Sequence, residues 1–258
     1  MSPPLMPSVG QRGMTIVVDQ TCASLADRLR AVAPIFVFTR AGSVLTKPDI
    51  AVVELRDSLQ RSGSHGPYLI VAASFAGFTA LLYAFSHPEE VAGLVLVDSS
   101  HPKQSEVAIA ALPESDSEDP EITAFRKFLR GPGPDWEEGC RSLSALGSLG
   151  NLPLIVLAAD APPMPESLPL SMRTRLVESW HSLQHDHARR STRGEMRIVK
   201  DCGHAIASEA PHVVVAAIED VLRAAEKEPN KAPEPTTMDV TSRAPSSTSR
   251  ASHGRGSS

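Results

Sequence analysis

The sequence has little cysteine, and its cysteines do not form a recognisable set. Three occur in 258 residues, and they are Cys22, Cys140 and Cys202. They are widely spaced, odd in number and without a CxxC pair, so neither a disulfide framework nor a zinc knuckle is indicated. We therefore expect a reducing compartment, the cytoplasm.

The sequence also has no excess of positive charge, with 25 Lys and Arg against 30 Asp and Glu. The formal net charge is -5 and the sequence pI is about 6.0, whereas a nucleic-acid-binding domain typically carries a basic stripe. We expect a small-molecule substrate and no nucleic-acid partner. No internal repeat indicates a solenoid, and the composition says nothing about the oligomeric state.

Long apolar runs are missing as well. No stretch approaches the roughly 20 apolar residues that span a bilayer, so no membrane partner is expected. Residues 1–13 lack the charged start, apolar run and cleavage site of a secretory signal, and we interpret them as a short leader. Residues 227–258 are dominated by Pro, Ser, Thr, Lys and Arg, which predicts a disordered tail.

What the sequence does contain is a regular alternation of two kinds of segment. Hydrophobic residues make up 41% of the chain, enough for one domain over residues 14–226. Short continuous apolar runs are typical of strands buried on both faces of a parallel sheet, and segments with helical spacing lie between them. An α/β fold is therefore predicted, with a mostly parallel sheet and helices on both faces. The predicted strands are 15–18, 35–39, 68–73, 94–98, 154–159 and 196–200, and the predicted helices include 24–32, 49–62, 75–86 and 209–225.

Residues 101–150 interrupt this alternation. Proline, glycine and acidic residues surround two or three short helical stretches there. The interval predicts a small, mainly helical cap inserted above the sheet.

The most informative stretch places a serine between a predicted strand and a predicted helix. The apolar run ending at Ala73 continues through Ser74-Phe75-Ala76-Gly77 directly into a helical pattern. A serine in this position lies on a sharp turn, with its hydroxyl above the sheet edge and a helix N-terminus behind it. This pattern predicts a nucleophile elbow.

With this elbow the sequence resembles the α/β-hydrolase family, whose elbow usually reads Gly-x-Ser-x-Gly. Ala72 and Ala76 stand at the two glycine positions, and alanine is the smallest substitute. The resemblance covers most of residues 14–224 and implies the α/β-hydrolase fold and an esterase-like or lipase-like serine hydrolase. Three further segments carry it: Thr39-Arg40-Ala41-Gly42, where the family often has Asp-Arg-x-Gly; Leu94-Val95-Leu96-Val97-Asp98; and Asp201-Cys202-Gly203-His204 after the last predicted strand.

The resemblance assigns the nucleophile to Ser74 and the general base to His204. A serine hydroxyl is a poor nucleophile near neutral pH, so a base must take its proton as it attacks. Histidine can do this because its ordinary pKa is about 6.5, and it can return the proton to the leaving group. Both residues follow strands at the same edge of the predicted sheet.

Two carboxylates qualify as the acid that orients His204. The chain order of this fold requires an acid between Ser74 and His204 at the end of a strand, and Asp98 and Asp160 both satisfy it. The more common family position falls on Pro162, and Asp160 comes before it. Some relatives use the end of the preceding strand, so Asp98 is preferred and Asp160 remains the alternative.

The oxyanion hole needs two backbone donors. The N–H of Phe75 is the first. The second normally comes from a glycine-containing loop after the first central strand, but this chain has Asp19-Gln20-Thr21-Cys22 there. The N–H of Gln20 or Thr21 is the expected substitute.

Two other functions remain open at this stage. The missing glycines favour a catalytically impaired hydrolase-like protein that binds a small molecule. His181 and His185, spaced i, i+4 on a predicted helix, are compatible with a metal-dependent activity, although HxxxH without a third ligand is usually a surface pattern. The preferred reading needs no cofactor and no metal, and it treats Cys202 as a packing residue.

Overall fold

The computed structural model describes residues 13–40, 47–112, 119–131 and 133–228. Nearly all of the predicted leader, and the tail from residue 229 onward, lie outside the described residues. The last helix continues to Lys227, one residue beyond the predicted end of the domain.

Six parallel strands form the central sheet, in the order β2-β1-β3-β4-β5-β6. The α/β prediction is confirmed. The paired residues Ala73 and Val97, Val97 and Leu157, and Ala159 and Val199 bring the carboxyl ends of β3 to β6 to one edge. The strands are β1 (Thr15–Asp19), β2 (Ile35–Phe38), β3 (Tyr68–Ala73), β4 (Val91–Val97), β5 (Leu154–Ala159) and β6 (Gly194–Val199).

Alternate side chains of the central strands enter two separate cores. Ile16 and Val18 belong to one cluster and Val17 to the other. The same alternation separates Val95 from Leu94. Because side chains of successive strand residues point to opposite faces, continuous apolar runs bury both faces of the sheet. Each fully buried side chain of this size contributes about 1.5–3 kcal/mol.

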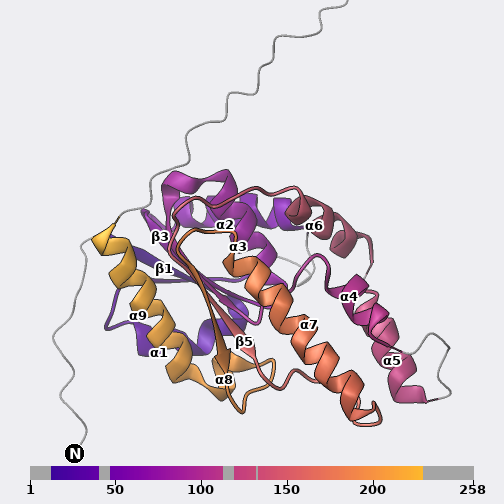
Figure 1. Ribbon diagram of the computed structural model, residues 1–258. Coiled ribbons are helices and arrows are strands. Elements are labelled where there is room, and N and C mark those ends of the chain that lie inside the picture. The colour runs from indigo at the N-terminus through magenta and orange to yellow at the C-terminus, as the bar shows by residue number, and fades with distance from the viewer. Residues whose placement is uncertain (1–12, 41–46, 113–118, 132, 229–258) are drawn as a thin grey trace, which may run out of the picture.

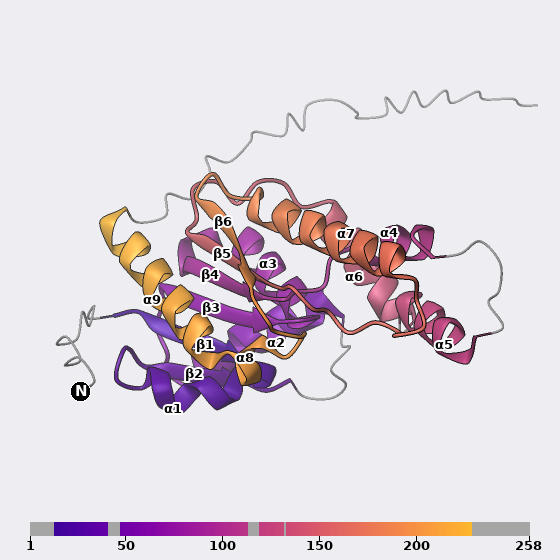
Figure 2. The ribbon, with the colours of Figure 1, turned by 60° about the horizontal axis from the view of Figure 1, so that its bottom comes forward.

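Helices cover both faces of the sheet (Figures 1 and 2). The first cluster packs against η1 (Gln20–Leu25), α1 (Ala26–Leu29), α8 (Ile206–Glu209) and α9 (Pro211–Lys227). The second packs against α2 (Pro48–Arg61), α3 (Ala76–Ser86), which η2 (Pro88–Glu90) follows, and α6 (Pro134–Ser144). Within the described ranges, no helix combines the length and apolar composition that crossing a bilayer requires.

The predicted cap interval divides into two parts. Helices α4 (Gln104–Ala110) and α5 (Pro120–Leu129) pack with the N-terminal part of α7 (Leu170–Ala188) in a third cluster that includes Ile122 and Leu176. They lie beyond the end of the sheet, beside α7 (Figures 1 and 2). By contrast, α6 joins the sheet-covering layer, where Trp136 stacks on Phe78 of α3. The cap above the strand ends is therefore built from α4, α5 and α7.

Candidate active site

Ser74 lies on the tight turn between β3 and α3. Its φ of 52° is left-handed, a conformation that costs a non-glycine residue about 1–2 kcal/mol. Three backbone hydrogen bonds hold the turn: Ser74 N–H donates to Val97 O at 3.1 Å, and Ser74 O accepts from Gly77 N–H at 3.1 Å and from Ser100 N–H at 3.0 Å. The strain is thus fixed by β4, its following segment and the start of α3.

The close approach in this turn falls at Gly77. A Cβ added there would lie 2.4 Å from Ser99 Oγ, a distance that no packing tolerates. The methyl groups of Ala72 and Ala76, in contrast, border a small cavity of about 10 Å³. Alanine is accommodated at both flanking positions because this space is available.

His204 meets Asp98 across the strand ends. Its Nδ1 lies 2.6 Å from Asp98 Oδ2. An ionised carboxylate only accepts hydrogen bonds, so Nδ1 carries the proton and neutral His204 keeps the lone pair on Nε2. His204 is half-buried in the segment after β6, whereas the Asp98 side chain is 1% exposed.

Asp98 is held by donors on both of its carboxylate oxygens. Oδ1 accepts from the N–H of Ala159 at 2.9 Å and from the indole N–H of Trp180 at 2.7 Å, while Oδ2 faces His204. The backbone N–H of Asp98 donates to Leu157 O at 2.7 Å. These hydrogen bonds fix the orientation of the carboxylate and direct Oδ2 toward the imidazole.

Asp160, the alternative acid, points elsewhere. Its Oδ1 accepts from Cys202 N–H at 3.3 Å, and its Oδ2 lies 3.5 Å from Lys200 Nζ. It ties the end of β5 to the segment after β6. Of the two candidate acids, the structure places Asp98 against the imidazole.

The environment of His204 favours its protonated form. The hydrogen bond that His204 donates to Asp98 and the negative charge of Asp98, with a further contribution from Glu209, raise the pKa of His204 above its ordinary value, although burial opposes them. Glu209 also accepts the N–H of Gly203 at 2.6 Å and so fixes the loop that carries the histidine. A base whose pKa is shifted toward the working pH suits general base catalysis.

Cys202, two residues before the histidine, is a buried thiol. Burial and the neighbouring Glu209 raise its pKa to about 11, and its Sγ lies 3.4 Å from Glu209 Oε2. The protonated thiol belongs to the apolar cluster under α9. It is not activated as a nucleophile.

Strained backbone gathers at this edge. Among the described non-glycine residues, positive φ occurs at Ser74, Asp98 and Asp201. Ser74 directly follows β3, Asp98 directly follows β4, and Asp201 lies shortly after the end of β6. Such residues persist only where the surrounding structure fixes them, and they cluster at functional sites. Here two of the three carry side chains of the candidate site.

The turn after β1 is organised by a buried carboxylate. Asp19 Oδ1 accepts from the N–H of Thr21 at 2.7 Å and from its hydroxyl at 2.6 Å, while Oδ2 accepts from Ala73 N–H at 2.7 Å. The N–H of Thr21 is therefore used inside the turn, which removes Thr21 as an oxyanion donor. Gln20, the first residue of η1, and Phe75, at the N-terminus of α3, remain the candidates.

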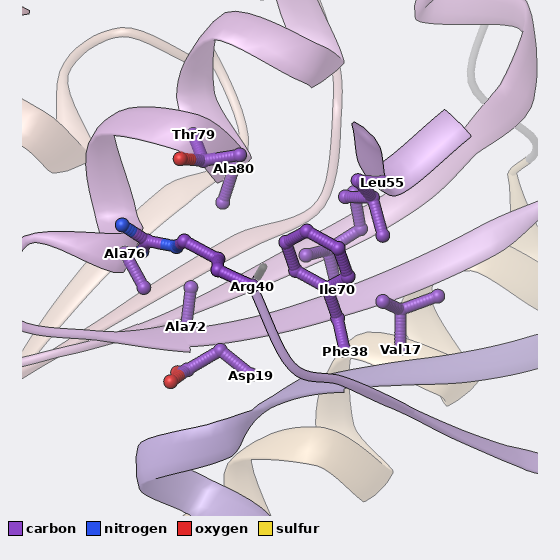
Figure 3. Close-up of a pocket in the computed structure, with 10 residues that line it drawn as sticks. All are labelled: Val17, Asp19, Phe38, Arg40, Leu55, Ile70, Ala72, Ala76, Thr79 and Ala80. Carbon is purple, nitrogen blue, oxygen red and sulfur yellow. The ribbon is translucent and has the colours of Figure 1, made fainter. Parts of the chain in front are cut away.

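Arg40 lies across the back of the elbow. Figure 3 shows its side chain extending past Ala72 toward Ala76, with Asp19 on the other side of Ala72. Its guanidinium is 5.8 Å from the centre of the Phe75 ring, within range of a cation–π interaction. Burial lowers its pKa, and the charge of Asp19 partly offsets this effect. The cation thus packs behind the turn that presents Ser74.

A cavity of about 180 Å³ opens between the strand ends and the cap. Ser74, Asp98 and His204 all line it. Apolar side chains from α4, α5, α7 and the segment 162–164, among them Phe125 and Leu176, form most of the remaining wall. The serine, the histidine and an apolar chamber therefore share one space.

The histidines proposed for a metal are engaged otherwise. His181 Nε2 lies 3.0 Å from the carbonyl oxygen of Ala159, to which it donates, and His185 is exposed. No group of three or more His, Cys, Asp or Glu side chains suited to a metal ion gathers among the described residues. The metal alternative receives no support from this arrangement.

Sequence reasoning missed two parts of the site. The sequence shows Asp19 only as part of a loop without glycine, and no local pattern indicates that its carboxylate anchors Ala73 and Thr21. Polar residues on a helix are expected to face water, yet Gln184 and His187 of α7 are fully buried. The sequence shows only that Trp180, Gln184 and His187 share one helix face; it does not show that this face is buried.

Comparisons with known proteins identify the family to which this chain belongs. The sequence model of the alpha/beta hydrolase family matches residues 10–217. Comparison with curated protein sequences gives no significant match.

Solved structures similar to this chain include a thermophilic esterase from Thermogutta terrifontis, at 17% identity and a TM-score of 0.53, with 84% of this chain and 91% of that chain covered. An alpha/beta hydrolase enzyme from a sediment metagenome of the lagoon of Mar Chica, Morocco, matches at 14% identity and a TM-score of 0.53, covering 84% and 93%. An alpha/beta hydrolase fold protein from Burkholderia ambifaria matches at 18% identity and a TM-score of 0.51, with 82% of this chain and 91% of that chain covered. At these identities the structures support the fold, and together with the family match over most of the chain they show that this protein belongs to the alpha/beta hydrolase family.

Proposed function

We propose that this hydrolase is a serine esterase that cleaves a small carboxylic ester through Ser74, His204 and Asp98. The observation that carries the proposal is the 2.6 Å contact of His204 Nδ1 with buried Asp98, in a cavity that Ser74 also lines from a strained turn. A buried carboxylate, an imidazole and a serine on a strained turn are the groups that a serine hydrolase uses for acyl transfer.

In the first half-reaction, Ser74 Oγ attacks the carbonyl carbon of the ester while His204 Nε2 takes the hydroxyl proton. The resulting oxyanion is stabilised by the N–H of Phe75 and a second donor, for which Gln20 is our candidate. The bond between the carbonyl carbon and the alcohol oxygen then breaks, and the proton on His204 goes to that oxygen. The alcohol leaves, and the acyl group stays on Ser74.

Water reverses the sequence. His204 removes a proton from the attacking water, whose oxygen bonds to the carbonyl carbon, and the proton then returns to Ser74 Oγ as the acyl bond breaks. Asp98 keeps the proton of the neutral imidazole on Nδ1 throughout and stabilises the imidazolium. These steps consume one ester and one water and release an acid and an alcohol, so they call for no cofactor or metal.

The chamber sets the class of ester. Its volume of about 180 Å³ is close to that of apolar cavities of about 150 Å³ that hold one benzene molecule. Its wall is mainly apolar, with Phe125 and Leu129 of α5 opposite Leu176 of α7. We propose substrates whose apolar part has about six carbon atoms. The three free cysteines agree with action in the cytoplasm.

A fluorophosphonate probe tests the nucleophile. We expect labelling of the wild-type protein and none of the Ser74→Ala variant, with loss of p-nitrophenyl hexanoate hydrolysis in parallel. Ser100→Ala is the matched control, because Ser100 lines the same cavity but lies outside the proposed triad, and it should still be labelled. Absent labelling of folded wild-type protein would favour the alternative, a hydrolase-like protein that only binds a small molecule.

A further inference from the structure

One face of α7 is bonded residue by residue to the segment that follows β4. Trp180, Gln184 and His187 are spaced i, i+4, i+7 and so share a face of the helix. The indole N–H of Trp180 donates to Asp98 Oδ1 at 2.7 Å, and Gln184 Nε2 donates to Ser99 O, also at 2.7 Å. The third donor, His187 Nε2, lies 2.9 Å from Ser100 O. Three consecutive residues are thus held by three donors of one helix.

Trp180 differs from the other two because its acceptor is a carboxylate. Oδ1 of Asp98 receives both the Ala159 N–H and the Trp180 indole N–H, while Oδ2 receives His204 Nδ1–H. The two donors on Oδ1 fix the rotation of the carboxylate about its Cβ–Cγ bond. They leave Oδ2 directed at the imidazole.

Trp180 also belongs to the wall of the substrate chamber. The helix that carries it joins the cap cluster through Leu176, one turn before it. The same side chain therefore contacts both the apolar chamber and the acid behind the histidine. Among the described residues of α4, α5 and α7, Trp180 is the one whose side chain donates to Asp98.

We propose that Trp180 is a positioning residue of the active site, whose indole N–H holds the Asp98 carboxylate in line with His204. The inference rests on the proposed serine esterase function and extends it to the cap. The indole N–H orients the carboxylate. It also weakens the attraction between Asp98 and the imidazolium, because a donor on Oδ1 disperses part of the negative charge.

The sign of the effect follows from this dispersal. Without the indole donor, the carboxylate holds a proton on His204 more strongly, so the pKa of His204 rises. Two other influences act on the pKa of His204. The charge of Glu209 of α8 also raises it, and burial of the imidazole lowers it. Trp180→Phe leaves Glu209 in place, and the phenyl ring keeps an aromatic side chain in the wall that Trp180 shares with His204.

The test compares Trp180→Phe with Gln184→Met. Phe keeps an aromatic wall and removes the N–H, whereas Met removes a donor of the same helix face that bonds to the neighbouring residue, Ser99. We expect Trp180→Phe to raise the titration midpoint of His204, measured by NMR, by about half a pH unit or more, and to lower kcat about tenfold with KM within twofold. Gln184→Met should lower the urea unfolding midpoint and leave the His204 midpoint in place.

Biosynthetic 5-fluorotryptophan tests the same bond without changing the fold. The chain has only two tryptophans, and the second, Trp136, packs against Phe75 and Phe78 on the sheet-covering side. Fluorination makes the indole N–H more acidic and a stronger donor, so the midpoint of His204 should move down. This shift is opposite in sign to that of Trp180→Phe.

An unchanged His204 midpoint in Trp180→Phe, with an effect on KM alone, would reduce Trp180 to a wall residue and overturn the proposal. An equal shift in Gln184→Met would overturn it as well, because anchoring of the segment would then explain the effect. The NMR titration needs no turnover. A wild-type protein that hydrolyses nothing would contradict the proposed function, while the titration would still decide whether Trp180 acts on Asp98 and His204.

Discussion

Replacing Asp98 by asparagine should invert the tautomer of His204. The carboxylate accepts two N–H donors on Oδ1, from Ala159 and Trp180, and one on Oδ2, from His204. An asparagine has a single acceptor oxygen, and two donors hold it at the Oδ1 position. Its NH2 group must then face His204, and Nδ1 must accept a hydrogen bond from it instead of donating one.

The proton of the neutral imidazole then moves to Nε2, the atom that has to accept from Ser74. A base in the wrong tautomer loses about a thousandfold to ten-thousandfold in kcat at a serine triad, which corresponds to about 4–5 kcal/mol of transition-state stabilisation. The lost anion also removes the main cause of the raised pKa of His204. The acidic limb of kcat/KM, which rises as the imidazole loses its proton, should therefore move to lower pH.

The assay is hydrolysis of p-nitrophenyl hexanoate between pH 5 and 9, with circular dichroism as the check on folding. Asp160→Asn is the matched control, because Asp160 bonds to Cys202 N–H and faces Lys200; we expect it to lower kcat less than tenfold and to leave the acidic limb in place. A folded Asp98→Asn protein that keeps more than a tenth of wild-type kcat would refute the tautomer argument. So would a larger loss in Asp160→Asn than in Asp98→Asn.

Three further predictions concern stability. Gly77→Ala should lower the free energy of unfolding by about 1–3 kcal/mol in urea titration, since its Cβ would lie 2.4 Å from Ser99 Oγ; an unchanged midpoint would contradict the close packing. Asp19→Asn should cost about 1–3 kcal/mol, because its NH2 must face one of the N–H groups that the carboxylate now accepts, and a thermal melt identical to wild type would disprove this. Burial lowers the pKa of His187 to about 3, below its value in the unfolded chain, so the unfolded state takes up the proton first and stability falls by about 1.4 kcal/mol per unit as pH drops below about 6. His187→Gln, which keeps a donor for Ser100 but does not titrate, should flatten this slope, and a slope as steep as wild type would point to other groups.

The fold could be predicted because its signals are local. Apolar runs such as 68–73 and 154–159 became strands with the predicted bounds, since burial on both faces needs a continuous run of this length. Where the prediction was short, a tertiary contact explains the difference. β4 begins at Val91 and not at Leu94, and Gly93 within it makes room for Val221 of α9, which a Cβ would approach to 2.3 Å. A glycine that breaks the pattern locally is required by a helix 128 positions later in the chain.

The candidate site was only partly accessible from sequence. The elbow and the Gly203-His204 loop have local patterns, so Ser74 and His204 could be named as candidates. Asp98 and Asp160 could not be separated on residues alone, because both end strands at the same sheet edge. What separates them is the direction of their side chains, which depends on donors from three other segments.

The polar face of α7 shows why such hydrogen-bond donors cannot be predicted from the sequence. Its tryptophan, glutamine and histidine were visible at helical spacing, but polar residues on a helix usually face water, and only the partner decides otherwise. Here the partner is the segment after β4, which turns away from the sheet at Asp98 with a positive φ and exposes its carboxylate and two carbonyl groups to the helix. A buried acceptor without a donor costs about 1–3 kcal/mol, so the strained turn and the polar helix face require each other. The turn also carries the proposed acid, so one helix face does two things: Gln184 and His187 hold the carbonyl groups of Ser99 and Ser100, and Trp180 alone donates to the Asp98 carboxylate. Substitutions of Gln184 and His187 should therefore change stability, whereas substitution of Trp180 should also change the titration of His204.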